Sequence, residues 1–132
     1  MARRGALADF VDDLQVAGRL TFTRDEAMSA LRVSMAALKQ AALRLAKRGR
    51  LVSPRRGFYV IVPLEHRATG APPVDSWLAA LLLFSGVREL GREVVDGEVV
   101  VTVDRRLRAV EVGRLRLRFA VGDRRKWQGA GE

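Results

Sequence analysis

The chain has 132 residues, 48% hydrophobic and 30% charged, a composition that suits one domain of ordinary size or two small ones. Its 24 Lys and Arg exceed its 15 Asp and Glu, and the net charge of +9 favours an acidic partner: nucleic acid, an anionic membrane or an acidic protein. Because the sequence has no cysteine, disulfides, thiolate nucleophiles and cysteine-type zinc sites are excluded. Neither a signal peptide nor an apolar run of about 20 residues is evident, so we expect a cytoplasmic protein.

Three helices and a short strand are predicted in the first third of the chain. Apolar residues recur at helical spacing over residues 6–18, and residues 20–22 alternate like a short strand. Thr23, with a glutamate three positions later, has the pattern of a capping box and predicts a second, short helix. Ser34 is placed to cap a third helix that runs to Lys47.

A hairpin follows the third helix. Residues 51–52 and 58–62 read as strands, and the turn between them, Pro-Arg-Arg-Gly, begins at Pro54. The predicted order is then helix, strand, helix, turn, helix, hairpin, which is that of a winged helix-turn-helix. In this interpretation the second and third helices form the helix-turn-helix pair, and the hairpin is the wing.

The basic residues of the third helix and the hairpin favour DNA as the partner. From Lys39 to Arg56 there are seven basic residues and no acid, and cations of this kind gain affinity by releasing counterions from phosphates. The alternative is a solvated helix face and a soluble loop. Base readout and phosphate contact alone both remain open for the third helix. The predicted DNA-binding residues are Ser34, Met35, Ala37, Lys39, Gln40, Arg44 and Lys47 in the recognition helix and Arg55 and Arg56 in the wing.

The second half carries less net positive charge and is predicted to form a smaller unit. Residues 1–70 hold 13 Lys and Arg against 6 Asp and Glu, whereas residues 71–132 hold 11 against 9. A helix is expected from Trp77 to Phe84, and a hairpin at Asp96-Gly97. The predicted fold class is α+β, a winged helix-turn-helix followed by a shortened region of one helix and antiparallel strands. The predicted parts are 1–62 (DNA-binding domain), 63–73 (linker), 74–121 (abbreviated α+β domain) and 122–132 (disordered tail).

The sequence contains few candidate catalytic residues. His66, the only histidine, stands in the predicted linker, where neither cysteine nor a second histidine could join it at a metal. Motifs of serine hydrolases, phosphate-binding loops and zinc proteases are absent from the sequence. We therefore expect no enzyme, no catalytic residues, no cofactor and no metal site.

Four segments carry a resemblance to a known family: FTRDEAMSAL, the run S-x-x-x-L-K-x-A-x-x-R-L, RRGFYVIVP, and GAPPVDSW. The chain resembles the AbiEi family, antitoxins and transcriptional regulators of bacterial type IV toxin–antitoxin systems, well over residues 5–84 and loosely over 99–119. The family's usual small-residue and His-Gly stretch is replaced here by SGVRELGREVVDGE, so its second domain is abbreviated.

This resemblance implies a winged helix that represses its own operon by binding inverted repeats, which favours two copies per operator. It also implies a second domain that counteracts a nucleotidyltransferase-like toxin without stably binding it. The implied DNA contacts fall on Ser34, Lys39, Gln40, Arg44, Arg55 and Arg56.

Two other functions are compatible with the sequence. One is an interaction protein that neutralises a toxin, with DNA binding secondary. The other is a small basic RNA-binding protein, suggested by Arg114, Arg116 and Arg118, which share one face of a predicted strand. A half-exposed strand with a charged outer face is the simpler interpretation of these three arginines.

Overall fold

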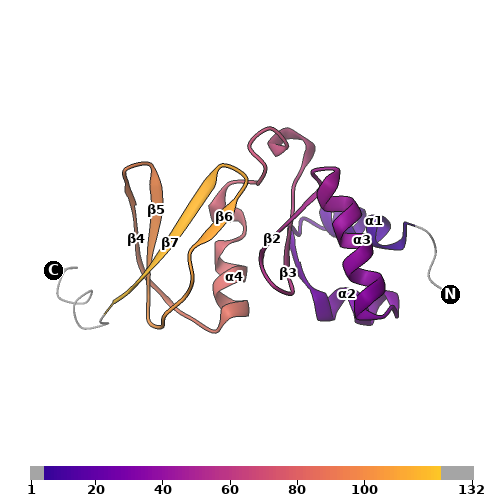
Figure 1. The fold of residues 1–132 in the computed structure, drawn as a ribbon, viewed down its shortest axis with the longest axis horizontal. Helices are drawn as coiled ribbons and strands as arrows, with labels where there is room; N and C mark the ends of the chain where they lie inside the picture. Colours follow the sequence, from indigo (N-terminus) through magenta and orange to yellow (C-terminus); the bar gives the residue numbers. More distant parts are fainter. Residues whose placement is uncertain (1–4, 123–132) are drawn as a thin grey trace.

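The structure is a computed structural model that describes residues 5–122, and over that range the fold is α+β with four α-helices and two sheets (Figure 1). The helices are α1 (Ala6–Val16), α2 (Arg24–Leu31), α3 (Met35–Lys47) and α4 (Leu78–Ser85). The strands are β1 (Thr21–Thr23), β2 (Leu51–Arg55), β3 (Phe58–Ile61), β4 (Glu89–Val95), β5 (Glu98–Val103), β6 (Val110–Val112) and β7 (Leu115–Val121). Residues 123–132 of the predicted tail lie outside the described residues.

Side-chain caps set the start of α2 and α3, as predicted. The Thr23 hydroxyl accepts a hydrogen bond from the Glu26 backbone N–H at 3.1 Å, and the Glu26 carboxylate accepts one from the Thr23 N–H at 3.1 Å. At α3 the Ser34 hydroxyl accepts from the Ala37 N–H at 3.1 Å. Each cap satisfies a backbone donor that the first turn of a helix leaves without an intrahelical partner. The two helices therefore begin at fixed residues, separated by a tight turn.

The first core lies between α1, α2, α3 and one face of a sheet with strand order β1-β3-β2. Phe22 of β1 is its largest fully buried side chain, stacked on Tyr59 with ring centroids 5.1 Å apart and met edge-on by Phe10 at 5.4 Å. Leu38 and Leu45 of α3 are also buried there. This packing holds α3 against the hairpin and leaves its opposite face in solvent.

The second sheet has strand order β4-β5-β7-β6. Asp96 and Gly97 form the β4–β5 turn with φ of 51° and 80°, as the Asp-Gly signal predicted. The prediction of purely antiparallel strands is wrong in one place, because β5 and β7 pair in parallel. The chain crosses to β6 at the sheet edge and returns as β7 between β5 and β6, so β7 runs in the direction of β5.

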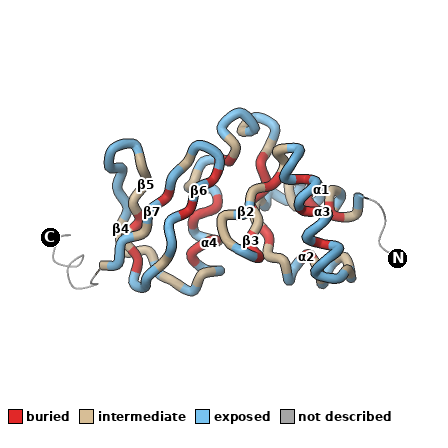
Figure 2. The backbone as a smooth tube through the Cα atoms, viewed as in Figure 1, coloured by how far each residue is buried: buried red, intermediate tan, exposed pale blue. Residues whose placement is uncertain are grey.

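Strand β3 contributes side chains to both cores, because successive residues of a strand point to opposite faces. Ile61 lies in the first core, whereas Phe58 and Val60 pack with Trp77 and Leu81 in a second core between α4 and the second sheet. In Figure 2, buried segments lie on both sides of the β2–β3 hairpin. The domain boundary predicted at residue 62 therefore falls within shared packing.

The connection over residues 63–73, predicted as a linker, is ordered and packed. Pro72 is buried, and its carbonyl oxygen accepts a hydrogen bond from Trp77 Nε1 at 3.0 Å. Gly70 crosses Gly113 of the β6–β7 turn so closely that a Cβ on Gly113 would lie 2.3 Å from the Thr69 carbonyl oxygen. This crossing fixes the connection against the second sheet.

Among the helices over residues 5–122, none has the length and apolar content needed to cross a membrane.

Candidate nucleic-acid interface

The solvent face of α3 carries the predicted recognition residues. Met35, Ala37, Lys39, Gln40, Arg44 and Lys47 are all exposed, and Ser34 is exposed at the cap. Leu38, Ala42 and Leu45, at helical spacing, are buried on the opposite face. The structure therefore brings these predicted side chains onto one helix and leaves them accessible.

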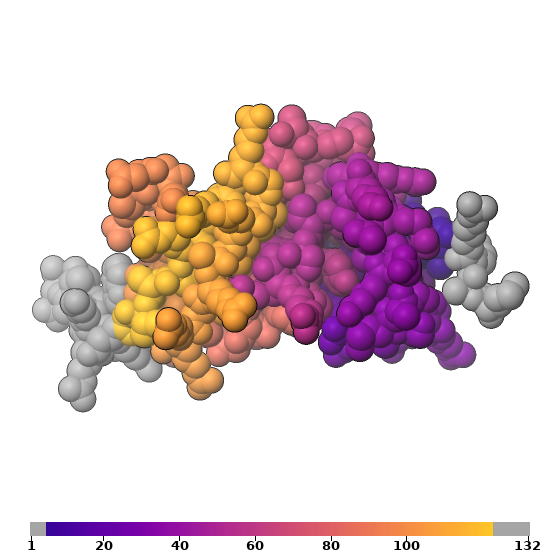
Figure 3. Space-filling model, in the orientation of Figure 1, coloured from indigo at the N-terminus to yellow at the C-terminus, as the bar shows by residue number. Residues whose placement is uncertain are grey.

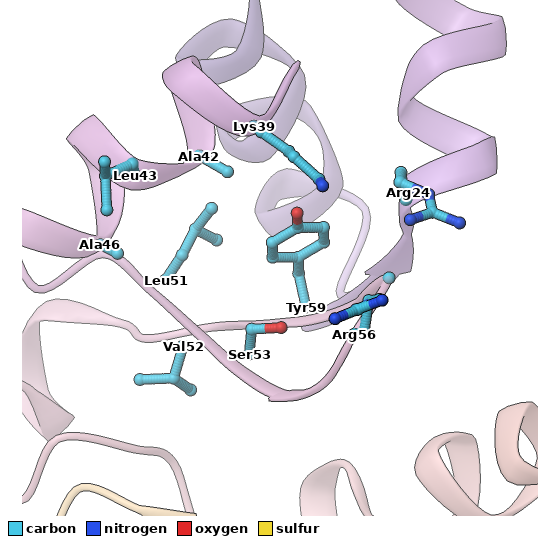
Figure 4. A pocket seen from close by; sticks show the side chains of 11 residues that line it. Arg24, Lys39, Ala42, Leu43, Ala46, Leu51, Val52, Ser53, Arg56 and Tyr59 are labelled. Atoms are coloured by element: carbon cyan, nitrogen blue, oxygen red, sulfur yellow. The ribbon is translucent and has the colours of Figure 1, made fainter. Parts of the chain in front are cut away.

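A groove of about 260 Å³ separates α3 from the β2–β3 hairpin. Its wall is mostly apolar and includes Leu43, Val52 and Tyr59. Three cationic side chains from three different elements also line it: Arg24 at the start of α2, Lys39 on α3 and Arg56 at the hairpin turn. Figure 4 shows Lys39 extending toward the Tyr59 ring, with Arg24 and Arg56 close to each other beside it. The groove thus has an apolar floor and a cationic rim.

Arg24 and Tyr59 are members of this site that the sequence reasoning missed. The Arg24 backbone N–H donates to the Gly57 carbonyl oxygen at 2.8 Å, which joins the start of α2 to the hairpin turn. Its Nε is buried and without a hydrogen-bond partner among the described residues, and its contact with Asp25 is long, at 3.9 Å. Burial raises the pKa of Tyr59, an effect that the nearby Arg24 charge opposes, so the phenol stays protonated. Two features of the sequence could have identified these residues: Tyr59 alternates with Phe58, so the two face opposite sides of the strand, and Arg24 directly follows the Thr23 cap.

The hairpin turn is tighter than predicted. Strand β2 continues through Pro54 to Arg55, and the turn itself consists of Arg56 and Gly57. An irregularity between Val52 and Arg55 accommodates Pro54, which has no backbone N–H to offer a strand partner. The Ser53 hydroxyl lies 2.8 Å from the carbonyl oxygen of Arg55 and 2.9 Å from that of Phe58, within hydrogen-bond distance of both.

The two arginines predicted at the wing tip face opposite ways. Arg56 is exposed and lines the groove beside α3. Arg55 turns to the second sheet, where its Nη2 donates to the Arg108 carbonyl oxygen and its guanidinium lies 6.0 Å from the centre of the Phe119 ring. Burial, and secondly the charge of Arg108, lower the pKa of Arg55. In this structure Arg55 thus points away from the groove that Arg56 lines, and its contact with DNA stays a prediction.

Among the basic residues between α3 and the hairpin, Arg50 is also engaged within the protein. Arg50, at the start of the hairpin, forms an ion pair with Asp12 of α1. This pair ties the hairpin to the first helix on the side away from the second sheet. Arg50 therefore has a structural role, and the accessible charge comes mainly from α3 and Arg56.

The arginines of β7 are largely matched by acids. Arg116 Nε lies 3.7 Å from carboxylate oxygens of both Glu98 and Glu111, and Arg118 Nη1 lies 3.6 Å from Glu98. This pattern fits the simpler interpretation of a charged outer strand face.

Over residues 5–122, no group of three or more His, Cys, Asp or Glu side chains is arranged to hold a metal ion.

Comparison with known proteins adds no relative: no family model, curated protein or solved structure matches the chain.

Proposed function

We propose that the chain is a winged helix-turn-helix protein that binds duplex DNA and represses transcription. The order α1-β1-α2-α3-β2-β3 and the strand order β1-β3-β2 support this class. The observation that carries the proposal is the convergence of Arg24, Lys39 and Arg56, from three elements, on one groove beside an exposed helix.

In this proposal α3 enters the major groove and the cationic rim contacts the adjacent phosphates. Ala36 and Ala37, both exposed near the start of α3, keep that end of the helix slim enough to approach base edges. Gln40 is suited to pair with adenine, and Lys39 with guanine or a phosphate. Arg56 contacts the DNA backbone beside the helix.

A salt titration tests the DNA-binding proposal. The affinity of the full chain for a short random-sequence duplex, measured by fluorescence anisotropy, should fall steeply between about 50 and 200 mM salt. K39Q and R56Q should each flatten the log–log slope by about 0.9, since each removes one phosphate contact. The matched control is R67Q, an exposed arginine of the connecting segment. Equal slopes for all three variants, or no salt-dependent binding by the parent, would contradict the proposal.

The resemblance to AbiEi extends the proposal to an autorepressor that also acts as the antitoxin of a nucleotidyltransferase-like toxin. RRGFYVIVP and GAPPVDSW, which carry much of that resemblance, form the hairpin and the packed connection to α4. Growth rescue tests the antitoxin half: the full chain is co-expressed with the toxin-like product of the neighbouring gene. The full chain is needed because the two halves share a core. Failure to rescue would remove the antitoxin activity and leave the DNA-binding proposal standing.

A further inference from the structure

Two groups of exposed arginines on the second sheet differ in their acidic partners. Those on β7, Arg116 and Arg118, have acidic partners, as described above. Those of the β5–β6 loop (residues 104–109) do not: the exposed side chains of Arg105, Arg106 and Arg108 form no ion pair with any residue in 5–122. The three arginines of this loop therefore carry positive charge that no ion pair within residues 5–122 compensates.

Asp104, the one acidic residue of that loop, is hydrogen-bonded to the segment before β4. The Asp104 carboxylate accepts a hydrogen bond from the Arg88 backbone N–H at 2.8 Å, and the Asp104 N–H donates to the Arg88 carbonyl oxygen at 3.1 Å. These two bonds hold the start of the loop against the segment that precedes β4. Asp104 is thus held at the base of the loop and forms no ion pair with the arginines that follow it.

The same loop is held against the hairpin. The Arg55 guanidinium binds the Arg108 carbonyl oxygen and lies over Phe119, and Val52 of the hairpin packs on the second core. In Figure 3 the orange spheres of this loop lie against the magenta spheres of the hairpin, on the face that also carries α3. The hairpin, whose turn carries Arg56, therefore lies between α3 and the loop.

We propose that the β5–β6 loop is a second phosphate-contacting element, which extends the duplex DNA footprint past the hairpin through Arg105, Arg106 and Arg108. This inference rests on the proposed DNA-binding function. Duplex DNA carries one charge per about 1.7 Å of helix axis, so a backbone that passes Arg56 presents further phosphates to a neighbouring basic loop. Each guanidinium can bind a phosphate with two parallel hydrogen bonds.

Arg55 has a defined part in this arrangement. Because the Arg55 guanidinium donates a hydrogen bond to the loop backbone, Arg55 in this proposal does not contact DNA and instead holds the loop beside the hairpin. A loop positioned before binding loses less conformational freedom when it meets the duplex. Arg55 is therefore a positioning residue, and the loop arginines make the contact.

The test compares two variants that lose the same charge. R105Q/R106Q removes two cations of the loop, and R67Q/R114Q removes two exposed cations near the Gly70–Gly113 crossing, where the Arg114 N–H donates to the Thr69 carbonyl oxygen at 3.2 Å. With the full chain and the random-sequence duplex, R105Q/R106Q should flatten the log–log salt slope by about 1.8, at about 0.9 per phosphate contact. R67Q/R114Q should leave the slope unchanged.

The outcomes separate the two proposals. If R56Q flattens the slope while R105Q/R106Q behaves like R67Q/R114Q, the loop proposal is overturned and the DNA-binding function stands. If the parent chain shows no salt-dependent duplex binding, both fall. Circular dichroism of each variant confirms folding, and R108Q, whose backbone carbonyl remains available to Arg55, supplies a third variant that should flatten the slope by about 0.9. A loop variant that weakens binding to structured RNA but not to duplex DNA also overturns the proposal.

Discussion

The α3–hairpin region and the second sheet are both rich in arginine, but they use it in different ways. Around α3, cations from three elements face one groove; of these, Lys39 and Arg56 form no ion pair with any residue in 5–122, and Arg24 has only a 3.9 Å contact with Asp25. On β7, each of Arg116 and Arg118 lies within ion-pair distance of a glutamate. The positive charge behind the net +9 is therefore more available to a partner around α3 than on β7. The two regions differ in how far acidic side chains pair with their arginines and lysines.

The two regions are nevertheless one packed structure, and removing a shared side chain tests this most strongly. Trp77 is 1% exposed and lies in the core to which β3 also contributes. We expect W77A to lower the free energy of unfolding by about 3–5 kcal/mol and to destabilise α3 and the second sheet together. Urea unfolding followed by circular dichroism and by amide hydrogen exchange measures both.

Leu83, on the helix that Trp77 directly precedes, is 84% exposed and provides the control for Trp77. L83A should change the free energy of unfolding by less than about 0.5 kcal/mol. Separate transitions for the two halves in W77A would show that the shared core does not couple them.

The contrast between free and paired cations can be measured directly on one position of each kind. K39Q should weaken duplex binding about eightfold at 0.1 M salt, the loss that a slope of about 0.9 per phosphate contact gives. R116Q should leave affinity within about twofold, because Arg116 is held near Glu98 and Glu111. Fluorescence anisotropy gives both values, and an equal loss of affinity in the two variants would show that the acidic partners of Arg116 make no difference to DNA binding.

The caps that place α2 and α3 are expected to contribute less. T23A removes the hydroxyl that accepts from the Glu26 N–H, and S34A the one that accepts from the Ala37 N–H. Each should cost about 1 kcal/mol of stability in thermal or urea unfolding. S29A, an exposed serine within α2, is the comparison, and an equal cost there would rule out capping as the cause.

The smallest effect is expected from Arg55, the neighbour of the groove residue Arg56. R55Q loses the charged contact over Phe119 and should lower the free energy of unfolding by about 0.5–1 kcal/mol. It should weaken binding less than R56Q does, since the Arg55 side chain faces the second sheet. A larger loss of DNA affinity in R55Q than in R56Q would reverse the assignment of the two arginines.

Signals that act over a few residues were predictable, and contacts between distant segments were not. Thr23, Ser34 and the Asp96-Gly97 turn behave as their local chemistry requires, because a cap or a tight turn is decided by residues three or four apart. The groove residues on α3 follow from helical periodicity. Arg55 could not be placed, because its partner Arg108 is 53 positions away and depends on how the two sheets meet.

The parallel pairing of β5 with β7 was missed for the same reason. Alternation and turn residues identify each strand, but they do not say which neighbour a returning strand chooses. The shared core likewise depends on β3 having two buried faces, one toward α3 and one toward α4. A boundary drawn at proline-rich sequence cannot detect that the strand before it is buried on both sides.

The Gly70–Gly113 crossing limits how this protein could be recombined. Two backbones meet there with no room for a side chain, so the connection after the hairpin and the β6–β7 turn act as a matched pair. A chimaera that places this second sheet behind a different N-terminal domain would need both glycines and the packed segment between β3 and α4. The unit of exchange is therefore the hairpin, connection and sheet together, and neither half is a module by itself.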